Sequence, residues 1–120
     1  MNERMKFTQL YAGPDGVSHF KEVEVEMKDR ADLEQISETM KATGVYFRVT
    51  EPNHHHDFVN APCRQLVITL DGEVEITASD GTKRRFGPGD ISLAADTTGR
   101  GHMAHVVSKK PRISIHVTLD

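Results

Sequence analysis

The sequence contains almost no cysteine and few aromatic residues. Of its 120 residues one is cysteine, none is tryptophan, and phenylalanine and tyrosine together make up 6%. Because Cys63 has no second cysteine to pair with, no disulfide can form within the chain, and nothing indicates an oxidising compartment. We therefore expect the protein to reside in the cytoplasm.

Long apolar runs and a strong excess of one charge are also absent. Met1–Lys6 leads into mixed polar residues rather than the apolar core of a signal peptide, and no stretch approaches the roughly 18 apolar residues that span a membrane. The net charge is −3, and the basic clusters Lys83–Arg85 and Lys109–Lys110 are short. We expect no export, no membrane partner and no nucleic-acid partner.

The remaining composition is that of one folded domain. Hydrophobic residues make up 37% of the chain and charged residues 28%, which is ordinary for a globular protein. No repeat, linker or low-complexity tract divides the chain. We predict a single domain over residues 1–120, with 1–45 forming N-terminal strands and a loop and 46–120 forming a barrel core.

Short strand-like runs with intervening glycines dominate the second half of the chain. These runs are 66–70, 73–77, 91–94 and 113–119, and the turns between them contain Gly72, Gly81 and Gly89. The pattern is typical of antiparallel sandwiches and barrels, so we predict an all-β fold. In the last run Ile113, Ile115, Val117 and Leu119 share one face, which we expect to lie in the core.

The N-terminal third is less regular. Residues 23–27 and 46–49 are strand candidates. Between them Leu33, Ile36 and Met40 recur at roughly helical spacing, but the segment is short and ends near Gly44. A helix and a loop therefore both stay open for this segment.

Two ordered segments resemble the motifs of the cupin superfamily, G-x5-H-x-H-x3-4-E-x6-G and G-x5-P-x-G-x2-H-x3-N. Gln65 stands at the glutamate of the first motif and Gly72 at its last glycine. Thr97 to His102 matches P-x-G-x2-H with threonine for proline, and Val106 replaces the asparagine. The resemblance implies a single cupin barrel, a double-stranded β-helix or jelly roll.

The runs 61–65 and 96–102 are similar to those of a group of small, largely uncharacterised bacterial cupins. In that group the first run follows aspartate, an aromatic residue and a histidine and ends in arginine-arginine-glutamine; here Val59 stands in place of the histidine and Cys63 in place of one arginine. The resemblance implies a homodimer. It implies no particular reaction, because cupins carry many activities.

His102 is the first candidate for chemistry, since the motif points its imidazole into the barrel, where it would act as an acid, a base or a metal ligand. Gln65 should face the same cavity. The cluster His54–His56 formally contains an H-x-H pair, but it precedes Gln65 by more than the motif allows. Either a loop returns His56, and with it His54, to the cavity as a metal ligand, or the cluster is a polar surface loop.

Three further residues are candidates for substrate binding. Arg48 and Arg64 would bind a carboxylate through two parallel hydrogen bonds, and Tyr46 would orient a ligand. His105 follows His102 by three residues and should point to the opposite face of a strand. We expect it to be structural or exposed.

These residues leave three functions open. The first is a small-molecule-binding cupin that uses a divalent metal, such as iron, manganese, nickel or zinc, to act on a small oxygenated substrate. The second is a binding or sensing module without metal. The third is a metal-free lyase or isomerase in which His102 works alone as acid or base. The sequence does not decide whether the protein is an enzyme.

Overall fold

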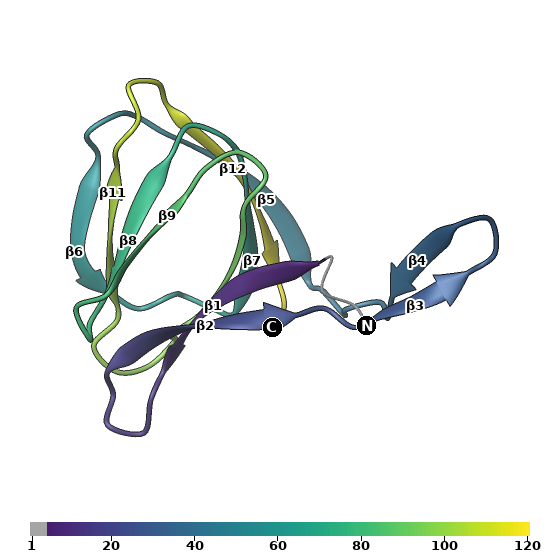
Figure 1. Cartoon of the computed structure of the whole chain (residues 1–120). Coiled ribbons are helices and arrows are strands. Elements are labelled where there is room, and N and C mark those ends of the chain that lie inside the picture. Colours follow the sequence, from purple (N-terminus) through teal and green to yellow (C-terminus); the bar gives the residue numbers. More distant parts are fainter. Residues whose placement is uncertain (1–4) are drawn as a thin grey trace.

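The computed structural model describes residues 5–120, and Figure 1 shows that they form strands joined by turns and loops. The first half contains β1 (Lys6–Ala12), β2 (Ser18–Glu24), β3 (Met27–Arg30), β4 (Glu34–Ser37), β5 (Gly44–Thr50) and β6 (His55–Val59). The second half contains β7 (Gln65–Asp71), β8 (Val74–Ala78), β9 (Lys83–Phe86), β10 (Ile91–Ala95), β11 (His102–Val106) and β12 (Arg112–Thr118). The predicted all-β fold is confirmed. Residues 1–4, on which part of the expectation about export rests, lie outside the described residues.

Two large sheets face each other in a jelly-roll arrangement (Figure 1). One has the strand order β2-β1-β10-β7-β12-β5, and the other has the order β6-β11-β8-β9. All pairs are antiparallel except β1 with β10, so the N-terminal strands enter the same sheet as the motif strands. Among residues 5–120 there is no helix long and apolar enough to cross a membrane.

The inward and outward faces of strand β12 are reversed relative to the sequence-based prediction. Its polar residues Ser114 and His116 point inward and are 0% and 4% exposed, whereas Ile113 is 38% exposed and Ile115 is only half-buried. The expectation that the isoleucine face lies in the core is therefore wrong. The physical reason is that the inner face of this strand borders a polar cavity, so the apolar residues alternate onto the outer face of the sheet.

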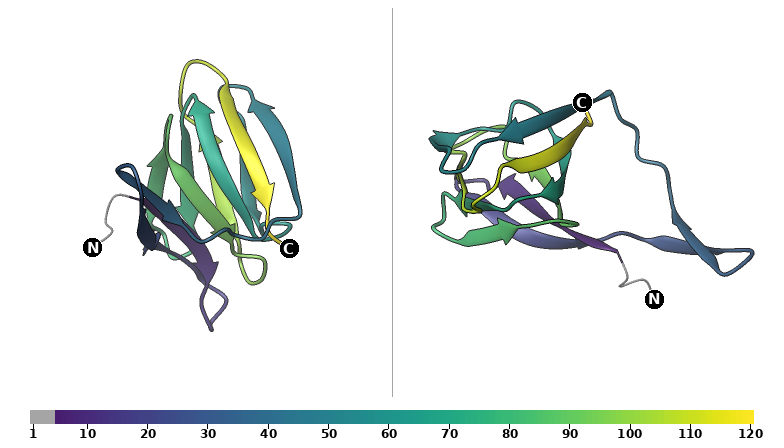
Figure 2. Two further views of the ribbon diagram at one scale, coloured as in Figure 1. Left: turned by 90° about the vertical axis from the view of Figure 1, so that its right-hand side faces the viewer. Right: turned by 90° about the horizontal axis from the view of Figure 1, so that it is seen from above.

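The segment with helical spacing is a strand hairpin. β3 pairs with β4 through a turn in which Asp32 and Leu33 both have positive φ, and no helix forms there. The predicted strand 23–27 is also interrupted, because β2 ends at Glu24 and β3 begins at Met27. Figure 2 shows that the hairpin projects away from the two large sheets.

Gly101 is the residue that allows β11 to start beside β6. Its φ is 77°, and a Cβ atom at this position would collide with the carbonyl oxygen of Val59. Only glycine adopts this conformation without cost and leaves room for the neighbouring backbone. The next residue is His102, so this close approach fixes where the predicted functional histidine enters the interior.

Candidate functional site

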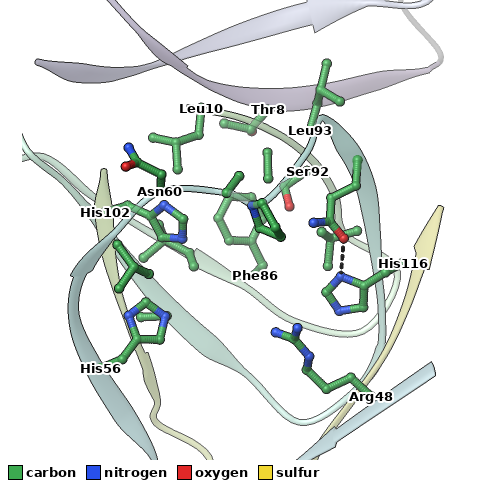
Figure 3. Close-up of a pocket in the computed structure, with 18 of the residues that line it drawn as sticks. Thr8, Leu10, Arg48, His56, Asn60, Phe86, Ser92, Leu93, His102 and His116 are labelled. Carbon is green, nitrogen blue, oxygen red and sulfur yellow. Dashed lines mark hydrogen bonds between the residues drawn. The ribbon is translucent and has the colours of Figure 1, made fainter. Parts of the chain in front are cut away.

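A cavity of about 270 Å³ lies between the two sheets. Its polar lining includes three histidines, two arginines and one glutamine: His56, His102, His116, Arg48, Arg112 and Gln65. Figure 3 shows His56 and His102 on one side and His116 and Arg48 on the other. None of the lining residues is aspartate or glutamate, so the cavity wall carries positive and neutral groups only.

His102 is held by a buried carboxylate. Its Nδ1 lies 2.6 Å from Oδ2 of Asp96, which is 0% exposed, while the His102 side chain keeps 13% of its surface accessible. An ionised carboxylate can only accept, so Nδ1–H donates and Nε2 carries the free lone pair. Asp96 Oδ1 has no hydrogen-bond partner within residues 5–120. The carboxylate of Asp96 therefore orients the His102 ring and leaves its Nε2 able to act as a base.

His56 lies close to His102. This was expected if a loop returned the histidine cluster to the cavity. The two ring centroids are 5.7 Å apart and the rings meet edge to face. Nδ1 of His56 donates to the carbonyl oxygen of Asp57 at 2.7 Å, which again leaves Nε2 free. His54 lies beside His56, at 6.5 Å between centroids, but it lines an adjoining depression, which shares His56 with the cavity, and does not line the cavity itself.

Gln65 faces the cavity as predicted and is 4% exposed, but its carbonyl oxygen is already engaged. Oε1 accepts hydrogen bonds from the Tyr46 hydroxyl at 2.8 Å and from His116 Nδ1 at 2.9 Å. The Tyr46 ring stacks on His116 with centroids 4.7 Å apart, so Tyr46 supports the wall of the cavity and is not among its lining residues. Ser114 donates to His116 Nε2 at 3.0 Å.

The two arginines predicted to bind substrate lie in different places. Arg48 lines the cavity. Arg64 pairs with Asp120 at 3.2 Å on the surface and does not line it. Thr69 is buried and accepts a hydrogen bond from Arg112. His105 is exposed, as expected, with its ring against His55.

The described residues do not make a complete metal site. Within residues 5–120 no group of three or more histidine, cysteine, aspartate or glutamate side chains is placed to hold a metal ion. His56 and His102 offer two imidazoles, and the carbonyl oxygen of Gln65 is taken by Tyr46 and His116. Because transition metals are commonly held by three or four protein ligands, this donor set is short of the predicted site.

Comparison with known proteins identifies the fold. No protein-family model and no curated protein matches the sequence. The structure is similar to the Schizosaccharomyces pombe Cnp3 cupin domain, with a TM-score of 0.50 and 10% identity over 100% of this chain and 86% of that one. The fold is that of a cupin. A Salmonella typhimurium protein assigned to ethanolamine utilization (protein Q) gives a TM-score of 0.50 and 12% identity over 96% of both chains.

Sequence reasoning missed two residues that line this cavity, Arg112 and His116, and it missed Asp96, which holds His102 from outside the lining. Asp96 and His102 stand six positions apart across a loop, which is no helical or strand period. Arg112 and His116 lie on β12, on the face that we had expected to point outward. Alternation along β12 could have indicated the last two residues. It places Arg112, Ser114 and His116 on a common face of the strand, but it does not say which face points inward.

Proposed function

We propose that this chain is a cupin that binds a small oxygenated organic molecule in its cavity and that His102 exchanges a proton with it. The observation that supports the proposal is the 2.6 Å hydrogen bond from His102, which lines the cavity, to the buried carboxylate of Asp96. The carboxylate fixes the ring tautomer and stabilises the imidazolium that forms when Nε2 takes up a proton. This is the chemistry of a metal-independent lyase or isomerase.

The step requires only groups that line the cavity. Nε2 of His102 would accept a proton from a C–H bond next to a carbonyl group of the ligand and return it to the same or a neighbouring carbon atom. The electron pair stays on the ligand as an enolate between the two transfers. The His102 side chain keeps 13% of its surface accessible, so the captured proton can exchange with solvent between the two transfers.

Proton exchange in heavy water tests the proposal directly. The protein would be incubated in D₂O with a panel of small keto and hydroxy acids and the corresponding amides, and loss of each C–H signal would be followed by proton NMR. We expect deuterium incorporation or a new product for at least one compound with wild type and none with His102→Gln. Ligand binding without exchange would instead support a non-catalytic binding or sensing module.

A divalent metal remains the alternative basis for activity. The metal-ligand roles predicted for His54, His56, Gln65 and His102 stay predictions, and the closeness of His56 and His102 is what favours them. Isothermal titration with manganese, iron(II), nickel and zinc ions tests them. If a site forms, His102→Ala abolishes tight binding and Gln65→Glu strengthens it, because a carboxylate adds negative charge beside the cation.

We further propose that the partner of this chain is a second copy in the cytoplasm, where its single free cysteine stays reduced. The outer face of β5 and β12 exposes Val45, Phe47, Val49 and Ile113. The β3–β4 hairpin stands clear of the sheets and exposes Leu33 (Figure 2). An isolated two-stranded hairpin is marginally stable in water, so a covering partner would stabilise it.

A further inference from the structure

The guanidinium group of Arg112 is buried in the cavity wall with no counter-charge. The residue is 8% exposed, and its side chain points inward from β12. One nitrogen, Nη2, donates to Thr69 Oγ1 at 3.0 Å, and Nε has no hydrogen-bond partner within residues 5–120. No salt bridge to Arg112 occurs in the described part of the chain.

Burying a charged guanidinium group costs free energy unless an anion or enough hydrogen-bond acceptors pair with it. Burial and the charge of Arg48 lower the pKa of Arg112 to about 10, so the side chain is still positively charged at neutral pH. A buried cation without an ion partner or a full set of hydrogen-bond acceptors loses several kcal/mol of hydration. The wall of this cavity therefore carries a positive charge that only an anion from outside the described chain can balance.

Arg48 adds a second positive charge on the adjacent strand. Ser114 of β12 pairs with Arg48 of β5, so Arg48 lies diagonally opposite Arg112 on the same inward face. Its guanidinium carbon lies 5.7 Å from the centre of the Tyr46 ring, a cation–π contact that holds the side chain at the rim. Neither arginine has a carboxylate partner among residues 5–120.

The neighbouring His116 does not compete for an anion and adds no charge. Burial, reinforced by the positive charges of Arg48 and Arg112, lowers the pKa of His116 to about 4, so the ring is neutral at pH 7. Both of its nitrogens are engaged, with Gln65 and with Ser114. The acidic residue of the site, Asp96, is bound to His102, which lies on the side of the cavity opposite His116 and Arg48 in Figure 3.

We propose that Arg112 and Arg48 form an anion subsite that binds a carboxylate group of the small ligand. A guanidinium fork matches the two oxygens of a planar carboxylate, and both arginines line the cavity without a carboxylate partner among residues 5–120. The inference rests on the proposed function and narrows the ligand to small organic acids. Their carboxylate is held on one wall while the rest of the molecule extends toward His102.

Matched ligand pairs test the subsite with the full chain. Succinate, benzoate and 2-oxobutyrate would each be titrated by calorimetry against the corresponding amide, with inorganic phosphate as a further anion. We expect at least one acid to bind wild type about tenfold more tightly than its amide or better, since hydrogen bonds to charged groups are the stronger ones. The inference is overturned if amides bind as well as acids, or if phosphate binds and no carboxylate does.

Arginine variants then assign the preference to these two residues. Arg112→Met and Arg48→Met should each remove most of the acid-over-amide preference, whereas Arg64→Met, on the surface, should leave it unchanged. Without ligand, Arg112→Met should unfold at the same or a higher temperature than wild type, because it removes an unpaired buried charge. If Arg112→Met does not fold, Arg48→Met decides, because Arg48 is exposed and its loss leaves the core intact.

The subsite and the proposed function can fail separately. If neutral ketones, alcohols or amides bind in the cavity but carboxylates gain nothing, the subsite is wrong and the binding function stands. If neither acids nor neutral compounds bind wild type, both are wrong. Retention of the full acid preference in both Arg112→Met and Arg48→Met would overturn the subsite even though the ligand class is correct.

Discussion

Oδ2 of Asp96 lies 2.6 Å from Nδ1 of His102, and the loop that joins the two residues contains Gly99 and Gly101 with φ of 81° and 77°. These left-handed positions turn the chain from the end of β10 back into β11, so that a residue before the loop meets one just after it. The backbone conformation of this one short loop therefore brings the Asp96 carboxylate into contact with the His102 ring.

The first prediction concerns this pair. Asp96→Asn should keep a hydrogen bond to His102 but lose the charge that stabilises the imidazolium, and the rate of C–H exchange in D₂O should fall by about tenfold or more. His102→Gln should cost on the order of 100-fold or more, because it removes the base. Equal exchange rates in wild type and both variants would show that another group moves the proton.

The second prediction concerns the glycine before His102. Gly101→Ala should lower the free energy of unfolding by about 2 kcal/mol or more, because alanine is strained at positive φ and its Cβ would collide with the Val59 carbonyl oxygen. Gly87→Ala is the matched control, since a Cβ there meets nothing within 4 Å, and it should change stability by less than about 0.5 kcal/mol. Urea unfolding of the two variants compares them directly.

The third prediction concerns pH. The pKa of His116 is about 4 in the folded chain, below its ordinary value of 6.5, so the unfolded chain takes up this proton first as the pH falls. The stability from the neutral ring is complete above pH 6.5 and is lost as the pH falls from 6.5 toward 4. The slope from this one group approaches about 1.4 kcal/mol per pH unit.

His116→Asn should flatten the fall in stability over that pH range, as measured by urea unfolding at a series of pH values. His105→Asn is the control, because His105 is exposed on β11 and its removal should leave the slope as in wild type. A slope that is unchanged in His116→Asn would mean that other groups account for the acid sensitivity.

The sequence was sufficient for the fold class but not for the orientation of its strands. Period-two alternation and turn glycines predicted four strands of the second half, and they form as β7, β8, β10 and β12. Alternation gives two faces for β12 without saying which is inside, and the usual preference for apolar interiors put Ile115 in the core instead of Ser114. A cupin interior that holds a polar cavity reverses that preference.

Part of the site was predictable from motif positions, and residue type alone predicted Arg48 and His56, which also line the cavity. Gln65 and His102 occupy motif positions, and both line the cavity as expected. Asp96 and Arg112 became visible only when the loop and the strand register brought them to His102 and Thr69. Contacts of this kind depend on tertiary packing, for which one sequence has no local signal.

The last prediction concerns association through the outer sheet face. Phe47 is 76% exposed, and its cross-strand neighbour Ile115 is only half-buried, so two adjacent strands present an apolar surface to solvent. A contiguous apolar patch of this kind commonly marks a protein interface. We expect wild type to sediment as a dimer at micromolar concentration and Phe47→Ser to sediment as a monomer with an unchanged circular dichroism spectrum.

Phe58→Ser is the matched control for this dimer. Phe58 lies on β6 of the other sheet and is 45% exposed, so this variant should still dimerise. A wild type that is monomeric at every concentration, or a Phe47→Ser variant that associates as tightly as wild type, would contradict the proposed dimer.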